Sequence, residues 1–181
     1  MYHDTVKFVI SPIPVLETKR LIIRQLSCLD KIDNYHSWMR SKSNLFIESV
    51  NSNVSKEDLY KYIDEKNSSD TALLFGIFDK ETKKHIGNGK FEPINFLQKF
   101  TVLGLFIGDV EFRGKGLAKE FIHCCFKKVL LPMNVDRILL GVDKENVNAI
   151  SAYSKAGFVK SNLSKLNLAP GSVELELKWK T

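Results

Sequence analysis

Long apolar runs are absent from this chain, as are internal repeats, low-complexity tracts and linkers rich in proline or glycine. No segment approaches the roughly 18 apolar residues that a membrane helix needs, and the N-terminus has no basic start leading into an apolar stretch. With 181 residues, 44% of them hydrophobic, the chain suffices for one core and is short for two. We therefore expect a single domain over residues 1–181, not exported and without a membrane partner.

Cysteine is scarce, and the three present, two of them adjacent at Cys124 and Cys125, cannot form a fully paired disulfide framework. A reducing compartment fits best, so we expect a cytoplasmic protein. The histidines form no ligand spacing with the cysteines, and we expect no metal site.

An excess of basic side chains, 27 Lys and Arg against 21 Asp and Glu, favours an anionic partner without identifying it. The lysines alternate with carboxylates, and no basic patch interleaved with aromatic residues is present. The sequence therefore gives no support to a nucleic-acid partner.

β-branched and apolar runs bounded by turn residues predict six strands in a mixed α/β chain. The last strand alternates in polarity, so we expect Glu174, Glu176 and Lys178 on a solvent-facing side. The six lie at residues 20–26, 72–78, 85–92, 101–107, 137–142 and 173–179.

Two S-x-x-D capping boxes, Ser27 with Asp30 and Ser55 with Asp58, precede apolar residues at helical spacing. They predict two helices between the first and second strands. Two further helices are predicted at about 114–131 and 147–156.

The segment TVLGLFIGDVEFRGKGLAKEF passes from a buried strand through Gly114 and Gly116 directly into an amphipathic helix. Glycines allow close backbone approach, and the unpaired amides of a helix's first turn favour phosphate oxygens. Arg113 and Lys115 add positive charge. The spacing fits neither G-x-G-x-x-G nor the P-loop, so the sequence leaves open an anion site or a plain turn.

A second cluster, N-x-x-A-x-x-x-Y-x-K-x-G-F, spans residues 146–158 and predicts a helix that begins after asparagines and ends at a glycine. Together with the loop at 111–116, it resembles the acetyl-CoA-binding motifs of the GNAT superfamily of N-acetyltransferases. The opening Leu16–Arg24 is similar to the branch that contains ribosomal-protein N-terminal acetyltransferases. Glu111 stands where the family pattern has glutamine or arginine.

This resemblance implies a central mixed, mostly antiparallel sheet of six to seven strands flanked by about four helices. It also implies a transferase that uses acetyl-CoA as co-substrate, without a metal. A backbone N–H near Leu105–Ile107, where the strand would bulge, would stabilise the oxyanion. The expected acetyl-CoA contacts are Leu105, Phe106, Ile107, Arg113, Gly114, Lys115, Gly116, Leu117, Ala118, Asn146 and Tyr153.

In the implied reaction, an amine attacks the thioester directly in a ternary complex. Tyr153 would be the acid for the leaving thiolate, with a core aromatic as the alternative, and Asn146 would contact the pantetheine arm or cap a helix. Candidate bases are Glu92, Asp109 and Asp143, each of which could instead be a surface carboxylate while a water chain removes the proton.

The acceptor stays open between a protein N-terminus and a small amine such as an aminoglycoside, a polyamine or an amino-sugar. A non-catalytic module that binds acyl-CoA is the alternative function. A homodimer is compatible with the sequence, which does not decide the oligomeric state.

Overall fold

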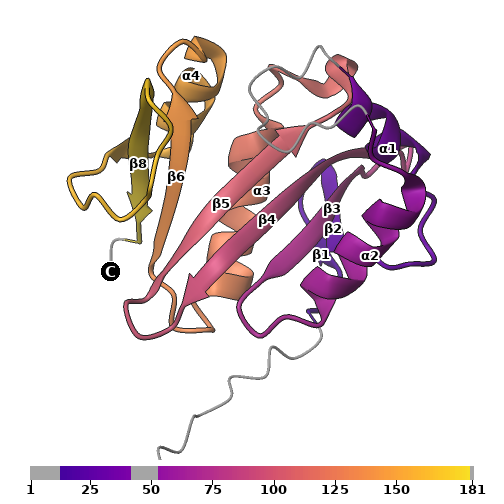
Figure 1. Cartoon of the computed structure of the whole chain (residues 1–181), viewed down its shortest axis with the longest axis horizontal. Helices are drawn as coiled ribbons and strands as arrows, with labels where there is room; N and C mark the ends of the chain where they lie inside the picture. Colours follow the sequence, from indigo (N-terminus) through magenta and orange to yellow (C-terminus); the bar gives the residue numbers. More distant parts are fainter. Residues whose placement is uncertain (1–12, 42–52, 180–181) are drawn as a thin grey trace, which may run out of the picture.

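The strands assemble into one eight-stranded sheet in the order β1-β2-β3-β4-β5-β6-β8-β7 (Figure 1). The structure is a computed structural model, and it describes residues 13–41 and 53–179. All neighbouring strands are antiparallel except β5 and β6. The strands are β1 (Leu16–Glu17), β2 (Leu21–Gln25), β3 (Leu73–Asp79), β4 (His85–Asn95), β5 (Phe100–Ile107), β6 (Arg137–Asp143), β7 (Val159–Lys160) and β8 (Ser172–Lys178).

The six predicted strands are confirmed, and the expected mixed, mostly antiparallel sheet is present. The two additional strands, β1 and β7, are two residues long. Strands this short carry no alternation that a sequence pattern could reveal.

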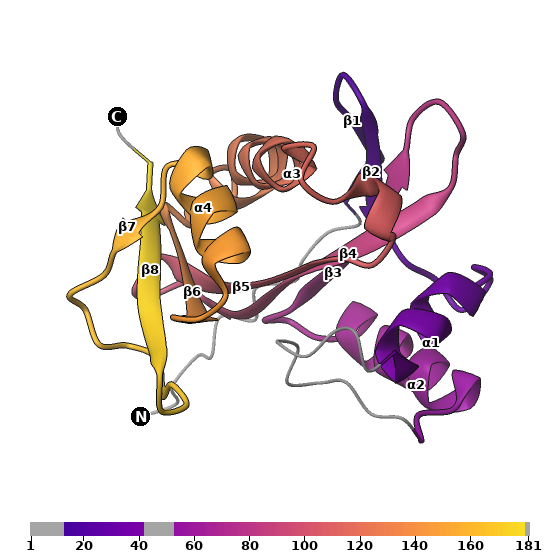
Figure 2. The same ribbon diagram turned by 90° about the horizontal axis from the view of Figure 1, so that it is seen from above.

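Two helices cover each face of the sheet (Figure 2). On one face lie α1 (Asp33–Arg40) and α2 (Lys56–Asn67), and on the other lie α3 (Leu117–Cys125) and α4 (Val147–Ala156). The chain continues after α3 as a π-helical turn, Phe126–Leu130. Within the described ranges, no helix is long and apolar enough to cross a membrane.

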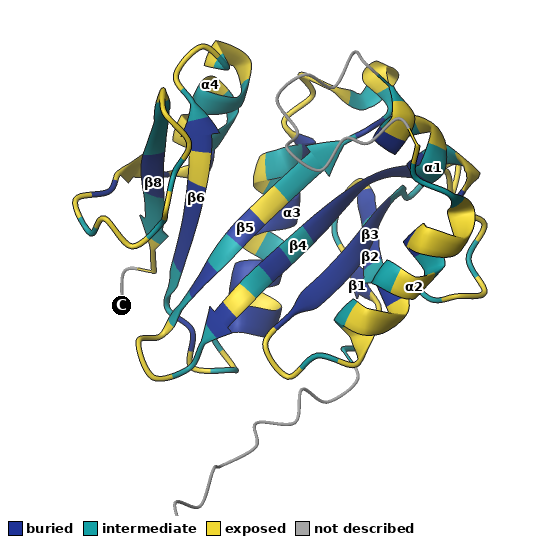
Figure 3. Cartoon of the chain, viewed as in Figure 1, coloured by how far each residue is buried: buried dark blue, intermediate teal, exposed yellow. Residues whose placement is uncertain are grey.

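The hydrophobic core has two parts, one on each face, and Figure 3 shows the buried residues that run along β3 and β4 between them. On the α3 side, Phe91 stacks on Phe121 with a centroid distance of 6.0 Å, and both rings are fully buried. On the α2 side, a smaller cluster includes Tyr35, Leu59 and Ile63. Packing on both faces holds β3 and β4 rigidly in the middle of the sheet.

The second predicted capping box is confirmed, whereas the first is wrong. Ser55 accepts from the amide of Asp58, and the Asp58 carboxylate accepts from the amide of Ser55, at the start of α2. The Asp30 carboxylate instead accepts from the Ser27 amide within a turn and pairs with Arg24, and α1 begins later, at Asp33. The Arg24 guanidinium is a stronger hydrogen-bonding partner for the Asp30 carboxylate than a backbone amide at a helix end.

Two other expectations need correction. The third helix begins at Leu117 rather than near residue 114, because two glycines with positive φ precede it. Glu174 is buried rather than solvent-facing. Its carboxylate accepts from the Ser161 hydroxyl and from the amides of Lys165 and Leu166, so it fastens a covering loop to β8.

Candidate functional site

The sheet opens where β5 and β6 diverge, as Figure 1 shows. The two strands pair only at Phe100–Val102 with Arg137–Leu139. Beyond this point β5 stays paired with β4 and β6 stays paired with β8. The facing edges of residues 103–107 and 140–143 therefore carry backbone donors and acceptors that no neighbouring strand satisfies. Arg113 donates to the Ile107 carbonyl, and edge groups without such a partner are available to a ligand.

The predicted contacts Leu105, Phe106 and Ile107 lie on this diverging edge and are half-buried. The bulge expected there is absent, since all three pair in regular register with β4. The register shifts instead in β4, between Phe91 and Ile94. Divergence from β6, rather than a bulge, is what exposes the edge of β5.

The loop after β5 has a backbone that only glycine adopts easily. Gly114 and Gly116 have φ of 72° and 74°, and a Cβ at either position would have no atom of residues 13–41 or 53–179 within 4 Å. Conformation, not crowding, therefore requires these glycines. Gly116 is the N-cap of α3, and Leu117 and Ala118 follow in its first turn.

The amides of residues 114–119 donate to no acceptor within the described part of the chain. They lie at the positive end of the α3 dipole, and this is the arrangement that favours phosphate oxygens. Lys115 is exposed beside them. Arg113 instead turns back, donating from Nε to the Ile107 carbonyl at 2.8 Å and from Nη2 to that of Gly108 at 3.1 Å, so that it fastens the loop to the end of β5.

A second anchor holds the loop from the opposite side. Arg20 Nη1 donates to the Lys115 carbonyl at 2.8 Å, and Arg20 Nε donates to the Glu120 carboxylate at 2.8 Å. Glu120 also accepts from the Thr18 hydroxyl and the Arg20 amide. Although burial opposes it, these donors lower the pKa of Glu120. Sequence reasoning assigned no role to Glu120, and only the opening motif hinted at Arg20.

Asn146 and Tyr153, both named from the sequence, belong to the cap and body of α4, the helix that follows β6. Burial raises the pKa of Tyr153 to about 12, and its ring lies 5.6 Å from that of Phe158. Among the described residues, no group forms a hydrogen bond with its hydroxyl. Asn146 caps α4, because its Oδ1 accepts from the Ala149 amide at 3.1 Å. Of the two roles that the sequence left open for Asn146, the structure thus shows the helix cap.

Each candidate base is already engaged. The Glu92 carboxylate accepts from Lys66 at 2.8 Å and from Lys90 at 2.9 Å, and these ammonium groups lower its pKa although burial opposes them. Asp109 pairs with Lys84 at 2.6 Å, and its pKa is also lowered against the effect of burial.

Asp143 accepts from the Glu145 amide at 2.8 Å. Glu111, the departure from the family pattern, is exposed, and its charge contributes to a raised pKa of Lys84. The carboxylates near the loop therefore lie among cations or backbone donors.

On the α1 and α2 side, the sheet carries a polar stripe that sequence reasoning missed. Asn88, Lys90 and Glu92 alternate along β4, and Lys90 pairs with Gly104 of β5. The sequence did contain a signal for this stripe, because these polar residues occupy every second position of an otherwise apolar strand. Trp38 of α1 closes this side: its ring forms an edge contact with Phe106 at 5.7 Å.

The remaining chemically active side chains have structural partners. Cys125 is fully buried, which raises its thiol pKa well above the ordinary value. His123 forms a hydrogen bond with the Ala156 carbonyl at 2.7 Å and ties α3 to α4. The described residues contain no group of three or more side chains that could hold a metal ion.

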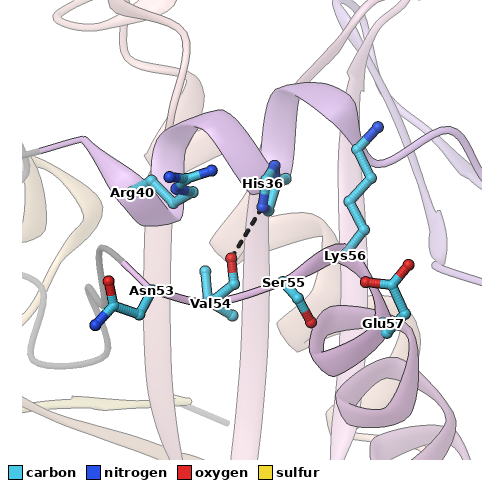
Figure 4. A pocket seen from close by; sticks show the side chains of 7 residues that line it. All are labelled: His36, Arg40, Asn53, Val54, Ser55, Lys56 and Glu57. Atoms are coloured by element: carbon cyan, nitrogen blue, oxygen red, sulfur yellow. Dashed lines mark hydrogen bonds between the residues drawn. The ribbon is translucent and has the colours of Figure 1, made fainter.

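A cavity of about 500 Å³ lies between the end of α1 and the start of α2, and its lining includes none of the catalytic or acetyl-CoA-binding residues predicted from the sequence (Figure 4). Within it, a ring nitrogen of His36 lies 2.9 Å from the Val54 carbonyl. It is lined by His36, Arg40, Asn53, Val54, Ser55, Lys56 and Glu57.

Comparison with known proteins identifies this architecture. The family model of the acetyltransferase (GNAT) domain matches residues 20–159. The probable N-acetyltransferase YjcK of Bacillus subtilis is 24% identical over 164 residues, covering 85% of this chain and 88% of that protein.

Two solved structures share the fold. One is the spermidine N-acetyltransferase of Vibrio cholerae in complex with CoA and spermine, with TM-score 0.70 and 22% identity, covering 89% of this chain and 96% of that one. The other is the ribosomal-protein-S5-alanine acetyltransferase of Vibrio fischeri, with TM-score 0.73 and 18% identity, covering 93% of this chain and 100% of that one.

Proposed function

The chain belongs to the GNAT family of acetyltransferases, and on this premise we propose that it transfers an acetyl group from acetyl-CoA to a primary amine by direct attack. One observation carries the proposal. The edge of β5 that diverges from β6 leads into a loop whose amides, residues 114–119, have no protein acceptor in the described chain. A strand edge next to an anion site suits a pantetheine arm joined to a pyrophosphate.

The residues present fit acetyl-CoA, which would supply the reactive thioester. The amides of residues 114–119 would hold the pyrophosphate, with Lys115 as an exposed cation nearby. Leu105, Phe106 and Ile107 would offer their backbone to the pantetheine arm, and one of their N–H groups would stabilise the oxyanion. Asn146 would contribute its free amide N–H₂ from the side of α4.

Tyr153 would donate a hydrogen bond to the thiolate that develops in the reaction. Since its pKa is about 12 and that of a thiol is ~8.5, complete proton transfer would be uphill by about 5 kcal/mol. A fixed hydroxyl donor without another partner can still stabilise the developing charge. We therefore assign Tyr153 a hydrogen-bonding role, with water protonating the thiolate.

The amine must lose a proton before it attacks. For an amine with a pKa of ~10.4, this costs about 4 to 5 kcal/mol at pH 7. Glu92 and Asp109 stay predictions as bases, but ion pairs lower the pKa of both and weaken them as proton acceptors. The ion pairs support the alternative in which a water chain removes the proton.

The experiment measures acetyl-CoA binding by calorimetry and free-thiol release with a panel of primary amines. Saturable binding with amine-dependent thiol release is expected. Binding without release on any amine would support the non-catalytic acyl-CoA module instead, and absence of binding would refute both functions. We also propose a cytoplasmic location, which the three free thiols support.

A further inference from the structure

The α2-facing side of the sheet is open at Gly104. In an antiparallel pair, directly opposed residues project their side chains on the same face, and Gly104 is opposed to Lys90. Among the described residues, no atom lies within 4 Å of a Cβ built on Gly104. Gly104 also lies just beyond Val102, the last β5 residue paired with β6. An acceptor that approaches the diverging edge from this side therefore passes beside Lys90.

Two lysines border this open surface and share one partly buried partner, Glu92. Lys90 Nζ lies 2.9 Å and Lys66 Nζ 2.8 Å from the Glu92 carboxylate, and both ammonium groups lie over the Tyr62 ring, at 5.9 and 5.2 Å. The side chain of Lys66 is only 12% exposed and that of Lys90 33%. Lys66 also contacts Glu65, but that carboxylate is 72% exposed and largely screened by water. We call Lys66 and Lys90 the lysine pair.

Both lysines stay charged at neutral pH. Their contacts with Glu92 raise the pKa of Lys66, and they raise that of Lys90 although burial opposes the shift. Partial burial weakens the screening of these charges by water. The open surface at Gly104 is thus next to a persistent positive charge that Glu92 compensates only in part.

Resting on the proposed function, we infer that the acceptor is an amine that also carries an anionic group, bound by the lysine pair beside Gly104. A second ammonium on the acceptor would meet repulsion there, so a polyamine fits poorly. With a rise of ~3.4 Å per residue, Gly104 lies about 7 Å along β5 from Phe106. The anionic group would therefore be several bonds from the amine, as a phosphate on a short chain would be.

The test uses three conjugates in which an acetyl bridge links the CoA sulfur to an aminopropyl chain ending in phosphate, hydroxyl or ammonium. The CoA part anchors each conjugate, so differences between them report on the acceptor side alone. A charged hydrogen bond contributes ~1.5 to 3 kcal/mol, so the phosphate conjugate should bind at least about tenfold tighter than the hydroxyl conjugate. The ammonium conjugate should bind no tighter than the hydroxyl conjugate.

Variants assign the preference to the lysine pair. Lys90→Gln should reduce the phosphate preference to less than about threefold, since one of two cations is lost. Glu92→Gln should increase it, because it frees both ammonium groups. Lys80→Gln removes a similarly exposed lysine that pairs with Glu17 instead of Glu92, in the turn between β3 and β4, and should leave the preference unchanged. Thermal unfolding of each variant checks that it is folded.

The outcomes separate the two proposals. If CoA itself does not bind, the proposed function fails. If CoA binds but the ammonium conjugate binds tightest, or the phosphate conjugate gains nothing over the hydroxyl conjugate, the inferred acceptor class is wrong while the acetyltransferase assignment stands. The inferred acceptor class is equally wrong if Lys90→Gln leaves the phosphate preference intact.

Discussion

Arg20 connects the turn between β1 and β2 with the loop before α3, and its replacement tests how that loop is held. Its Nη1 donates to the Lys115 carbonyl. In a planar trans peptide, this carbonyl and the N–H of Gly116 point in opposite directions. Arg20 therefore fixes the direction of the Gly116 N–H, one of the amides proposed to bind the pyrophosphate.

The expected magnitude follows from this contact. A hydrogen bond from a charged donor contributes ~1.5 to 3 kcal/mol when it is shielded from solvent. The side chain of Arg20 is 43% exposed, so we expect about 1 kcal/mol after screening, or an approximately fivefold change in affinity. Arg20→Gln should thus weaken acetyl-CoA binding about fivefold.

The informative assay compares two ligands by competition binding. Acetyl-pantetheine lacks the pyrophosphate, so Arg20→Gln should leave its affinity unchanged while that of acetyl-CoA falls. Arg24→Gln is the matched control, because this nearby arginine on β2 pairs with Asp30 instead of with the loop. Equal weakening of both ligands would mean that Arg20 acts through the fold in general, and unchanged acetyl-CoA affinity would refute the positioning role.

Three further predictions concern the loop, the leaving group and stability. Gly116→Val should weaken acetyl-CoA binding at least about tenfold, because a β-branched residue strains at a φ of 74°. Gly171→Val, which is strained at a φ of 89° in the turn before β8 and outside the loop before α3, should not change the Kd measured by calorimetry. Tyr153→Phe should lower kcat by roughly 10² with little change in acetyl-CoA affinity. Because the pKa of Tyr153 is about 12, the pH profile of the wild-type kcat should show no basic limb from this group below about pH 10. A near-normal kcat in the variant, when chemistry limits the rate, would refute the role of Tyr153. The pKa of Glu120 is lowered in the folded state, so its stabilising effect is present above the unfolded pKa and disappears as the pH falls through the folded pKa. Between about pH 5 and 3, the Tm of the wild type should therefore fall more than that of Glu120→Gln. Parallel Tm curves for the two proteins would contradict this.

Local signals predicted most of the fold. The Ser55 capping box and the glycine C-cap at Gly157 depend on contacts within a few residues, and the structure has both. The six longer strands pair over long sequence separations, but their apolar runs and bounding turn residues are local signals, and the strands lie close to the predicted ranges. The first capping box failed for a reason of the same kind: Arg24, six residues away across a turn, competes for Asp30. Local patterns do not rank competing partners for one carboxylate.

Only part of the candidate site could be predicted from the sequence. The glycines of the loop could be named, since their function depends on backbone conformation. The roles of neighbouring charges could not. Arg113 was expected to face a phosphate but donates to two carbonyl groups, and Glu92 was expected near an amine but lies between two lysines. Which partner a long charged side chain takes is decided by elements distant in sequence.

The position of the site follows from how the two halves of the sheet are joined. A parallel pair needs a crossover, and α3 provides it between β5 and β6. Because β5 belongs to the antiparallel β1–β5 ladder and β6 pairs along its whole length with β8, each strand follows its own half once their short contact ends. The loop motif comes from the first half and the Asn146–Phe158 motif from the second. Each motif alone is a turn or a capped helix, and only the divergence between the halves separates the loop, which follows β5, from α4, which follows β6.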